Sequence, residues 1–155
     1  MGQWKTPTYQ YVGGWGGGGY STTDEDTVTY AVIDISSRQW TPYITWNFDA
    51  SSVSKVRSYC SSTYSNAKIT VEVYYSGSWH VIVNEQVMTE NGWQEHEIGS
   101  TEIATSMRLK MKNSSPFFSS MYVYEVDYYW VHTAHPLVNS SLTNSSPLII
   151  GGLTR

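Results

Sequence analysis

"KITVEVYYSGSWHVIV", residues 68–83, contains a first run in which apolar and polar side chains alternate and a second, largely apolar run. In the first run one set of alternate positions is entirely apolar or aromatic: Ile69, Val71, Val73 and Tyr75. Since successive side chains of a β-strand point to opposite faces, this periodicity predicts a strand with one buried face. The runs are joined by Ser76-Gly77-Ser78, whose composition favours a hairpin turn. The stretch therefore predicts a β-hairpin.

The same alternation recurs along the chain, most clearly in "SMRLKMK", residues 106–112. There Met107, Leu109 and Met111 alternate with cations, and we expect the cations to form the solvated face of a strand: Arg108, Lys110 and Lys112. Further candidate strands are residues 43–49, 54–60, 79–87, 94–98 and 121–130. No window of helical length shows the helical period of about 3.6 residues. About seven or eight such strands predict an all-β fold, an antiparallel β-sandwich of the jelly-roll type.

Composition narrows the class of protein. The chain of 155 residues fits one domain. Its net charge of −4 argues against nucleic-acid binding, which needs a clustered basic face. No apolar run approaches the ~20 residues of a membrane span and no signal-peptide pattern is present, so we expect a soluble chain without membrane insertion. The single cysteine, Cys60, excludes an internal disulfide, and we expect it to pack rather than to act as a nucleophile.

The composition also divides the chain into three parts. Residues 1–21 form a leader rich in glycine and aromatic residues, which we expect to pack on or beside the domain. Residues 22–132 carry the predicted sandwich. Residues 133–155, with two prolines and a repeated Asn-Ser-Ser, are typical of a linker and the start of a following segment. We therefore expect the chain to be a piece of a longer protein.

The order of short motifs between residues 22 and 130 resembles a known family. An acidic turn, "TDEDTVTYA" (23–31), comes first, and a fixed order of strand motifs follows: "RQWTPYITWNFD", "VSKVRSYCSS", "ITVEVYYSGSWHVI", "NGWQEHEI", "ATSMRLKMKN" and "MYVYEVDYYW". This order resembles the galactose-binding-like jelly roll of discoidin domains, coagulation-factor type C domains and related carbohydrate-binding modules. The chain departs from that pattern at Glu25, where the turn usually has glycine, and at Tyr30, where tryptophan is common.

The resemblance implies one structural calcium ion, bound by the acidic turn and by a glutamate of the last strand. The residues at the matching positions are Asp24, Asp26, Thr29 and Glu125. Calcium takes six to eight hard oxygen ligands, which carboxylates and backbone carbonyls can supply. The alternative is an acidic, solvated turn in which Asp24 caps its own backbone and Glu125 faces solvent or a cation.

A catalytic site is not predicted. The four histidines show no metal-ligand spacing, and His96 lies between two glutamates that a strand would send to the opposite face. No serine lies in a Gly-x-Ser-x-Gly elbow. Two carboxylate pairs could in principle supply an acid and a base, but both are explained better as surface or ion-binding groups: Asp24 with Asp26, and Glu125 with Asp127. We therefore expect a non-catalytic protein.

The aromatic residues fall into two groups. Five tryptophans lie on or beside predicted strands, where core or half-core packing is expected: Trp40, Trp46, Trp79, Trp93 and Trp130. Other aromatics lie in predicted loops, where they can contact a ligand. From these we predict a set of ligand-binding residues: Trp15, Tyr20, Tyr64, Phe117 and Phe118.

The stretch "VGGWGGGGY", residues 12–20, leaves three alternatives open for Trp15. A phosphate-binding loop is disfavoured, because no helix pattern follows the glycines. Trp15 can present a flat face that stacks on a sugar ring. Equally, the glycines can let the leader follow the sandwich while Trp15 fills a gap. The leader can also be disordered.

Together these features predict a non-catalytic binding module of a larger extracellular or virion-surface protein. We expect it to recognise a glycan or another cell-surface component through loops at one end of the sandwich. The alternative is a structural adhesion or assembly module that contacts other protein subunits. Three Asn-x-Ser sequons, at Asn113, Asn139 and Asn144, are compatible with glycosylation in an extracellular setting, but such sequons also arise by chance in so serine-rich a chain.

Overall fold

The structure is a computed structural model that describes residues 2–11, 13–16 and 30–132. Eight strands make up this part of the chain: β1 (Gly2–Lys5), β2 (Tyr9–Tyr11), β3 (Ala31–Ile35), β4 (Ile44–Ser62), β5 (Lys68–Tyr75), β6 (Ser78–Val87), β7 (Gly92–Lys112) and β8 (Ser119–Val131). It contains no helix, and hence no helix that could cross a membrane, within those ranges. The prediction of an all-β fold is confirmed.

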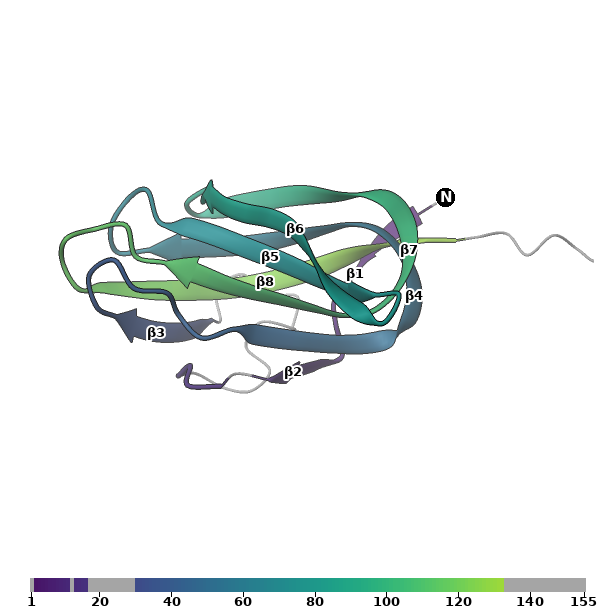
Figure 1. Cartoon of the computed structure of the whole chain (residues 1–155), viewed down its shortest axis with the longest axis horizontal. Helices are drawn as coiled ribbons and strands as arrows, with labels where there is room; N and C mark the ends of the chain where they lie inside the picture. The colour runs from purple at the N-terminus through teal and green to yellow at the C-terminus, as the bar shows by residue number, and fades with distance from the viewer. Residues whose placement is uncertain (1, 12, 17–29, 133–155) are drawn as a thin grey trace, which may run out of the picture.

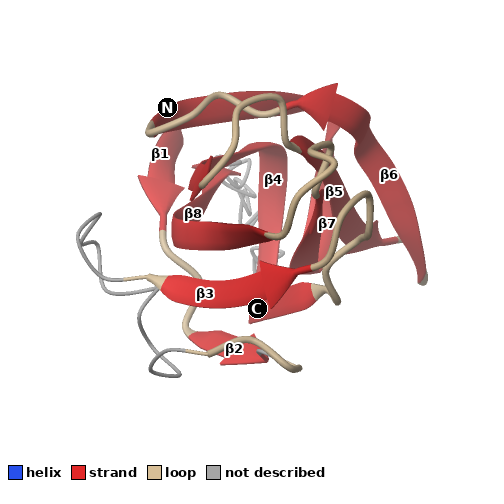
Figure 2. Ribbon diagram, turned by 90° about the vertical axis from the view of Figure 1, so that its left-hand side faces the viewer, coloured by secondary structure: helices blue, strands red, loops and turns tan. Residues whose placement is uncertain are grey.

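The strands form one continuous antiparallel sheet that folds over on itself into two facing layers (Figures 1 and 2). The long strands β4 and β7 bend and contribute to both layers. Their pairing shifts register between Asn47 and Ser51, and again between Val53 and Lys55, which marks the bend. One layer has the order β6-β5-β7-β4, with β2 beyond β4. The other layer has β8 next to β4, with β1 and β3 paired to β8.

Alternation along the strands builds the core between the layers. In β7 the side chains of Met107, Leu109 and Met111 are completely buried, and the intervening cations are half-buried. In β5 the predicted inward set, Ile69, Val71 and Val73, is buried as well. Trp46 on β4 is completely buried in this core. The core residues were therefore identifiable from their period of two.

The outer faces are less solvated than the sequence suggested. Glu72 on β5 is buried although it alternates with the core residues, because Arg108 and Tyr43 cover its carboxylate. Arg108 also lies over aromatic rings instead of extending into solvent. The expectation of a solvated face for the β7 cations is thus only partly correct, since aromatic side chains share that face.

The leader contributes to the sheets in the parts that the structure describes. β1 pairs with β8 and β2 pairs with β4. Gly16 exchanges two backbone hydrogen bonds with Val32 of β3, at 2.7 and 2.9 Å. The hydrogen-bonded sheets therefore begin well before residue 22.

Trp15 belongs to the hydrophobic core, which corrects its prediction as a ligand contact. Its side chain is 6% exposed, and its indole Nε1 donates a hydrogen bond to the Pro42 carbonyl oxygen at 3.1 Å. Gly14, just before it, has a φ of 84°, a conformation that glycine adopts without strain. The glycines thus allow the backbone to place an indole under the sandwich, as in the gap-filling alternative, and no ring face is left for a sugar.

Candidate functional site

Three loops meet at one end of the sandwich (the left-hand end in Figure 1). They are residues 36–43 between β3 and β4, residues 63–67 between β4 and β5, and residues 113–118 between β7 and β8. The second and third loops approach each other because β4 and β8 are paired up to Ser62 and Met121. Backbone hydrogen bonding continues one step further, from the Thr63 amide to the Ser120 carbonyl oxygen at 3.0 Å.

Asn113 links two of these loops, 36–43 and 113–118. Its side-chain Nδ2 donates to the carbonyl oxygens of Phe117 at 2.6 Å and Ser36 at 3.2 Å. Its Oδ1 accepts a hydrogen bond from the Ser115 amide at 2.9 Å. Asn113 is 1% exposed, so its side chain cannot accept a glycan in the folded protein, and its sequon fits the alternative of a chance occurrence. The buried amide instead fixes the loop that carries Phe117.

The rings of Tyr64 and Phe117 lie side by side at the rim of a surface hollow. Their centroids are 6.0 Å apart and the planes are inclined by 35°. Phe117 is 64% exposed and Tyr64 is 41% exposed, so both keep ring surface in contact with solvent. The hollow has a volume of about 340 Å³. Its lining is Tyr64, Ser65, Asn66, Ser114, Ser115, Pro116 and Phe117.

The chemistry of the hollow combines flat apolar surface with small polar groups. Ser65, Asn66 and Ser114 offer hydroxyl and amide groups beside the two rings. Asn66 has a φ of 68°, in the left-handed region that asparagine tolerates better than most residues. Sequence reasoning identified Tyr64 and Phe117 as exposed loop aromatics but missed these polar residues. Their position in loops next to those aromatics was the available signal.

The other predicted ligand-binding residues do not join this hollow. Phe118 is exposed next to Phe117 but does not line the hollow, and Trp15 is in the core. Tyr20 lies outside the residues that the structure describes.

A larger hollow of about 470 Å³ lies at the other end of the sandwich, around Trp4, Asp49 and Tyr128. The aromatic rings of this hollow already pack against other side chains. Tyr128 is buried and stacks on Phe48 at 4.1 Å, and the Arg57 guanidinium covers Trp4 at 4.3 Å. A ligand there would find little free ring surface. The smaller hollow therefore fits stacking recognition better.

Of the four predicted calcium ligands, the structure describes Glu125. This residue lies in β8 next to a register shift, where Tyr59 pairs with Glu125 but Cys60 pairs with Val123. It is 2% exposed, so the alternative of a solvent-facing Glu125 is wrong. Asp24, Asp26 and Thr29 lie outside the described residues. Within the described ranges, no three His, Cys, Asp or Glu side chains gather as a metal site would require.

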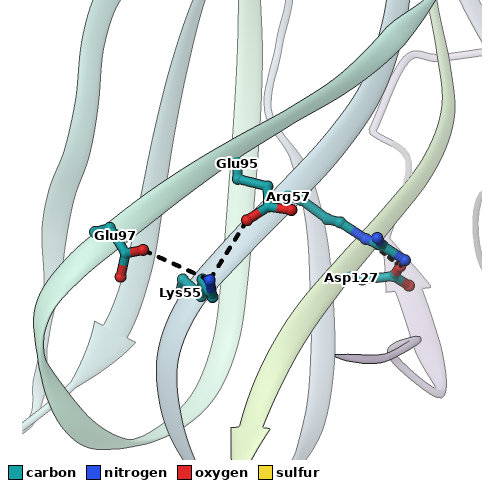
Figure 3. A network of polar contacts seen from close by, with 5 residues as sticks. All are labelled: Lys55, Arg57, Glu95, Glu97 and Asp127. Atoms are coloured by element: carbon teal, nitrogen blue, oxygen red, sulfur yellow. Dashed lines mark hydrogen bonds and ion pairs between the residues drawn. The ribbon is translucent and has the colours of Figure 1, made fainter. Parts of the chain in front are cut away.

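The thiol, imidazole and carboxylate groups considered for catalysis are buried or held in ion pairs. Burial raises the pKa of the Cys60 thiol to about 12, which keeps it from acting as a nucleophile. His96 is buried, and this burial lowers its pKa to about 4. Glu95 and Glu97 point to the opposite face, as predicted, where both contact Lys55 (Figure 3). Asp127 binds Arg57 at 2.7 Å and accepts a hydrogen bond from Thr6.

No protein-family model matches the chain, and no curated protein matches it either. Solved structures do. The CBM32 module of AlyQ in complex with 4,5-unsaturated mannuronic acid superposes with a TM-score of 0.57 at 18% identity, covering 81% of this chain and 97% of that one. The chain has the galactose-binding-like jelly-roll fold.

Two further solved structures are similar. A CBM32 module from Clostridium perfringens, in complex with GlcNAc-α-1,4-galactose, gives a TM-score of 0.55 at 13% identity and covers 82% of this chain and 88% of that one. A chitosan-binding module of a chitosanase/glucanase from Paenibacillus sp. IK-5 gives 0.54 at 15% identity, covering 83% and 92%. The chain spans 33% of a longer AlyQ structure that includes an alginate lyase domain. The similarity thus covers nearly all of the AlyQ CBM32 structure and a third of the longer one.

Proposed function

We propose that this chain is a non-catalytic glycan-binding module and that the hollow beside Tyr64 and Phe117 is its binding site. The observation that carries the proposal is the pair of exposed rings, 6.0 Å apart, held at one end of a jelly roll beside small polar side chains. Sugar rings have apolar faces that stack on aromatic side chains, and their hydroxyls pair with serine and asparagine. The similar structures named above are carbohydrate-binding modules, which supports a glycan as the ligand.

The site is built to be rigid before a ligand arrives. Asn113 fixes the Phe117 loop from below, and Thr63 ties the Tyr64 loop to Ser120. A preformed site loses little conformational entropy on binding. At about 340 Å³ the hollow lies near the lower end of ligand-site volumes, roughly 300 Å³. This size suits one or two sugar residues at the end of a chain.

A glycan array followed by calorimetry on the best ligand tests the proposal. Phe117→Ala should weaken binding about tenfold or more, because an aromatic stacking partner is removed. Ile103→Ala is a matched control, since Ile103 is a similarly exposed apolar residue on β7 away from the hollow. Equal effects of the two substitutions would contradict the site. If the wild-type chain binds no glycan and instead associates with protein subunits, the assembly-module alternative replaces the proposal.

The proposal includes an extracellular or virion-surface setting, because that is where a glycan-binding module meets its ligands.

The proposal also includes a structural calcium ion. Glu125 provides a buried carboxylate of the hard-oxygen type that calcium prefers, which fits the proposed ligand set. Asp24, Asp26 and Thr29 would complete it. Calcium should raise the melting temperature by mass action, and Glu125→Gln should abolish that rise. A melting temperature that changes neither with calcium nor with a chelator would contradict a structural calcium ion.

A further inference from the structure

Four cations lie on the outer face of the β6-β5-β7-β4 layer: Lys68, Arg108, Lys110 and Lys112. We call them the basic strip. They are four of the nine lysines and arginines of a chain whose net charge is −4. The three β7 members alternate with completely buried core residues, which places them on the outside of the sheet. Lys68 of β5 pairs directly with Lys112 of β7.

Aromatic rings lie between these cations. The Lys110 ammonium is 4.7 Å from the centroid of the Trp40 ring, and the Lys112 ammonium is 5.3 Å from the same ring. Arg108 stacks over Tyr43 and Trp79, at 4.2 Å from each. Cation–π contacts hold the side chains in place without neutralising their charge.

Carboxylates compensate only part of this charge. Glu72 is bound by Arg108 at 2.8 Å and by the Tyr43 hydroxyl, so it is fully engaged. Glu85 is shared between Lys68 at 3.4 Å and Lys112 at 3.7 Å. Lys110 has no carboxylate within ion-pair distance among the residues that the structure describes. Four cations therefore face two carboxylates, and the strip keeps an excess of positive charge.

The opposite layer shows that cation–ring contacts do not by themselves create such an excess. There Lys55 lies over Tyr129 at 5.1 Å, much as Lys110 lies over Trp40. However, Lys55 contacts both Glu95 and Glu97, and Arg57 is paired with Asp127 (Figure 3). Each of these two cations has at least one carboxylate partner. Lys55 and Arg57 are thus compensated, whereas Lys110 of the basic strip has no carboxylate partner among the described residues.

The strip begins where the proposed binding site ends. Lys68 directly follows the loop that carries Tyr64 and Asn66, and Lys112 directly precedes the loop of Asn113 and Phe117. The paired Lys68 and Lys112 therefore stand at the border between the hollow and the outer sheet face. Along β7 from this border come Lys112 and then Lys110, with the Trp40 ring near both ammonium groups.

We propose that the glycan recognised by this module is acidic, and that Lys110 and Lys112 bind its carboxylate or sulfate groups next to the hollow. The inference rests on the proposed function, since the hollow supplies the anchoring sugar site. Charge complementarity supports it: an ammonium group that lacks a carboxylate partner gains most from an anionic ligand. An acidic chain would also avoid the general negative charge of the protein by lying along this strip.

The test compares acidic and neutral oligosaccharides on the wild-type chain and on Lys110→Gln/Lys112→Gln. The probes are oligogalacturonate for carboxylate, a chondroitin sulfate oligosaccharide for sulfate, and neutral galacto- and chito-oligosaccharides. Lys55→Gln is the matched control, because it removes a half-buried lysine over aromatic rings from the other layer. Melting temperatures confirm that each variant is folded.

We expect the double substitution to raise the Kd for the acidic ligand about tenfold and to leave neutral ligands within about twofold, since a charge-assisted contact is lost. Wild-type affinity for the acidic ligand should also fall between about 50 and 200 mM salt. Lys55→Gln should change neither. Binding of neutral glycans with no preference for acidic ones, or a double variant equal to Lys55→Gln, would overturn this inference and leave the proposed function standing. No binding of any glycan would overturn the proposed function as well.

Discussion

Trp15→Ala removes the side chain by which the glycine-rich stretch packs into the core of the sandwich. The indole is 6% exposed, packs within the core cluster and donates to the Pro42 carbonyl oxygen at 3.1 Å. Truncating a buried tryptophan to alanine costs about 3–5 kcal/mol, because apolar contacts are lost and a cavity remains. For a chain of this size each kcal/mol corresponds to about 2–4 °C in melting temperature. We therefore expect melting to fall by about 6–20 °C.

Trp15→Phe separates the two parts of this effect. Phenylalanine retains an aromatic ring in the core but lacks the Nε1 donor, so the Pro42 carbonyl oxygen loses its partner. The cost should be smaller than for alanine, about 1–2 kcal/mol. Denaturant unfolding followed by tryptophan fluorescence and circular dichroism measures both variants against the wild type.

Glycan affinity measured below both melting transitions completes the experiment. Since Trp15 lies in the core and not at the Tyr64–Phe117 hollow, the folded fraction of either variant should bind like the wild type. A change in unfolding free energy within about 0.5 kcal/mol, as expected of an exposed residue, would refute the assignment of Trp15 to the core. If binding were lost at the same time, Trp15 would return to the ligand site.

Three further predictions concern buried polar groups. Burial lowers the pKa of His96 from 6.5 to about 4, so the unfolded chain binds the proton first, and the free energy of unfolding should fall by up to roughly 3 kcal/mol between pH 6.5 and pH 4. Urea titrations across this pH range should show the fall in the wild type and in His80→Gln but not in His96→Leu. Asn113→Ala should lower the free energy of unfolding by about 1–3 kcal/mol and weaken glycan binding, because the Phe117 loop loses its hydrogen bonds to Asn113. The control Ser114→Ala should leave the melting temperature unchanged, since no such side-chain bond of Ser114 occurs among the described residues. Cys60, with its pKa raised to about 12 by burial, should react with a thiol reagent only on unfolding, and rapid labelling of the native protein would contradict its burial.

The fold could be predicted because apolar and polar residues alternate along the strands of the sandwich. Met107, Leu109 and Met111 are inward for the same reason that they are spaced by two, and the order of the motifs around them indicated the jelly roll. The long bent strands β4 and β7 could not be predicted, because nothing local distinguishes one strand that crosses two layers from two shorter strands. The register shift at Asn47 is set by partners distant in sequence.

The candidate site was predicted in part. Tyr64 and Phe117 could be identified as exposed because apolar residues in short polar loops have few neighbours to cover them. Trp15 looked similar in sequence, yet the backbone carries it into the core through contacts with Pro42 that lie 27 residues away. The role of Asn113 could not be predicted, because one of its partners, Ser36, lies in another loop 77 residues away. Long-range contacts therefore decide which loop aromatic stays exposed and which becomes part of the core.

The most direct test of the binding site is a titration of the 15N-labelled chain with its best glycan ligand, followed by amide chemical shifts. We expect saturable shifts concentrated in residues 63–67 and 113–118, around Tyr64 and Phe117. Shifts centred instead on the hollow around Trp4 and Asp49 at the other end of the sandwich, or no saturable shifts with any glycan, would contradict it.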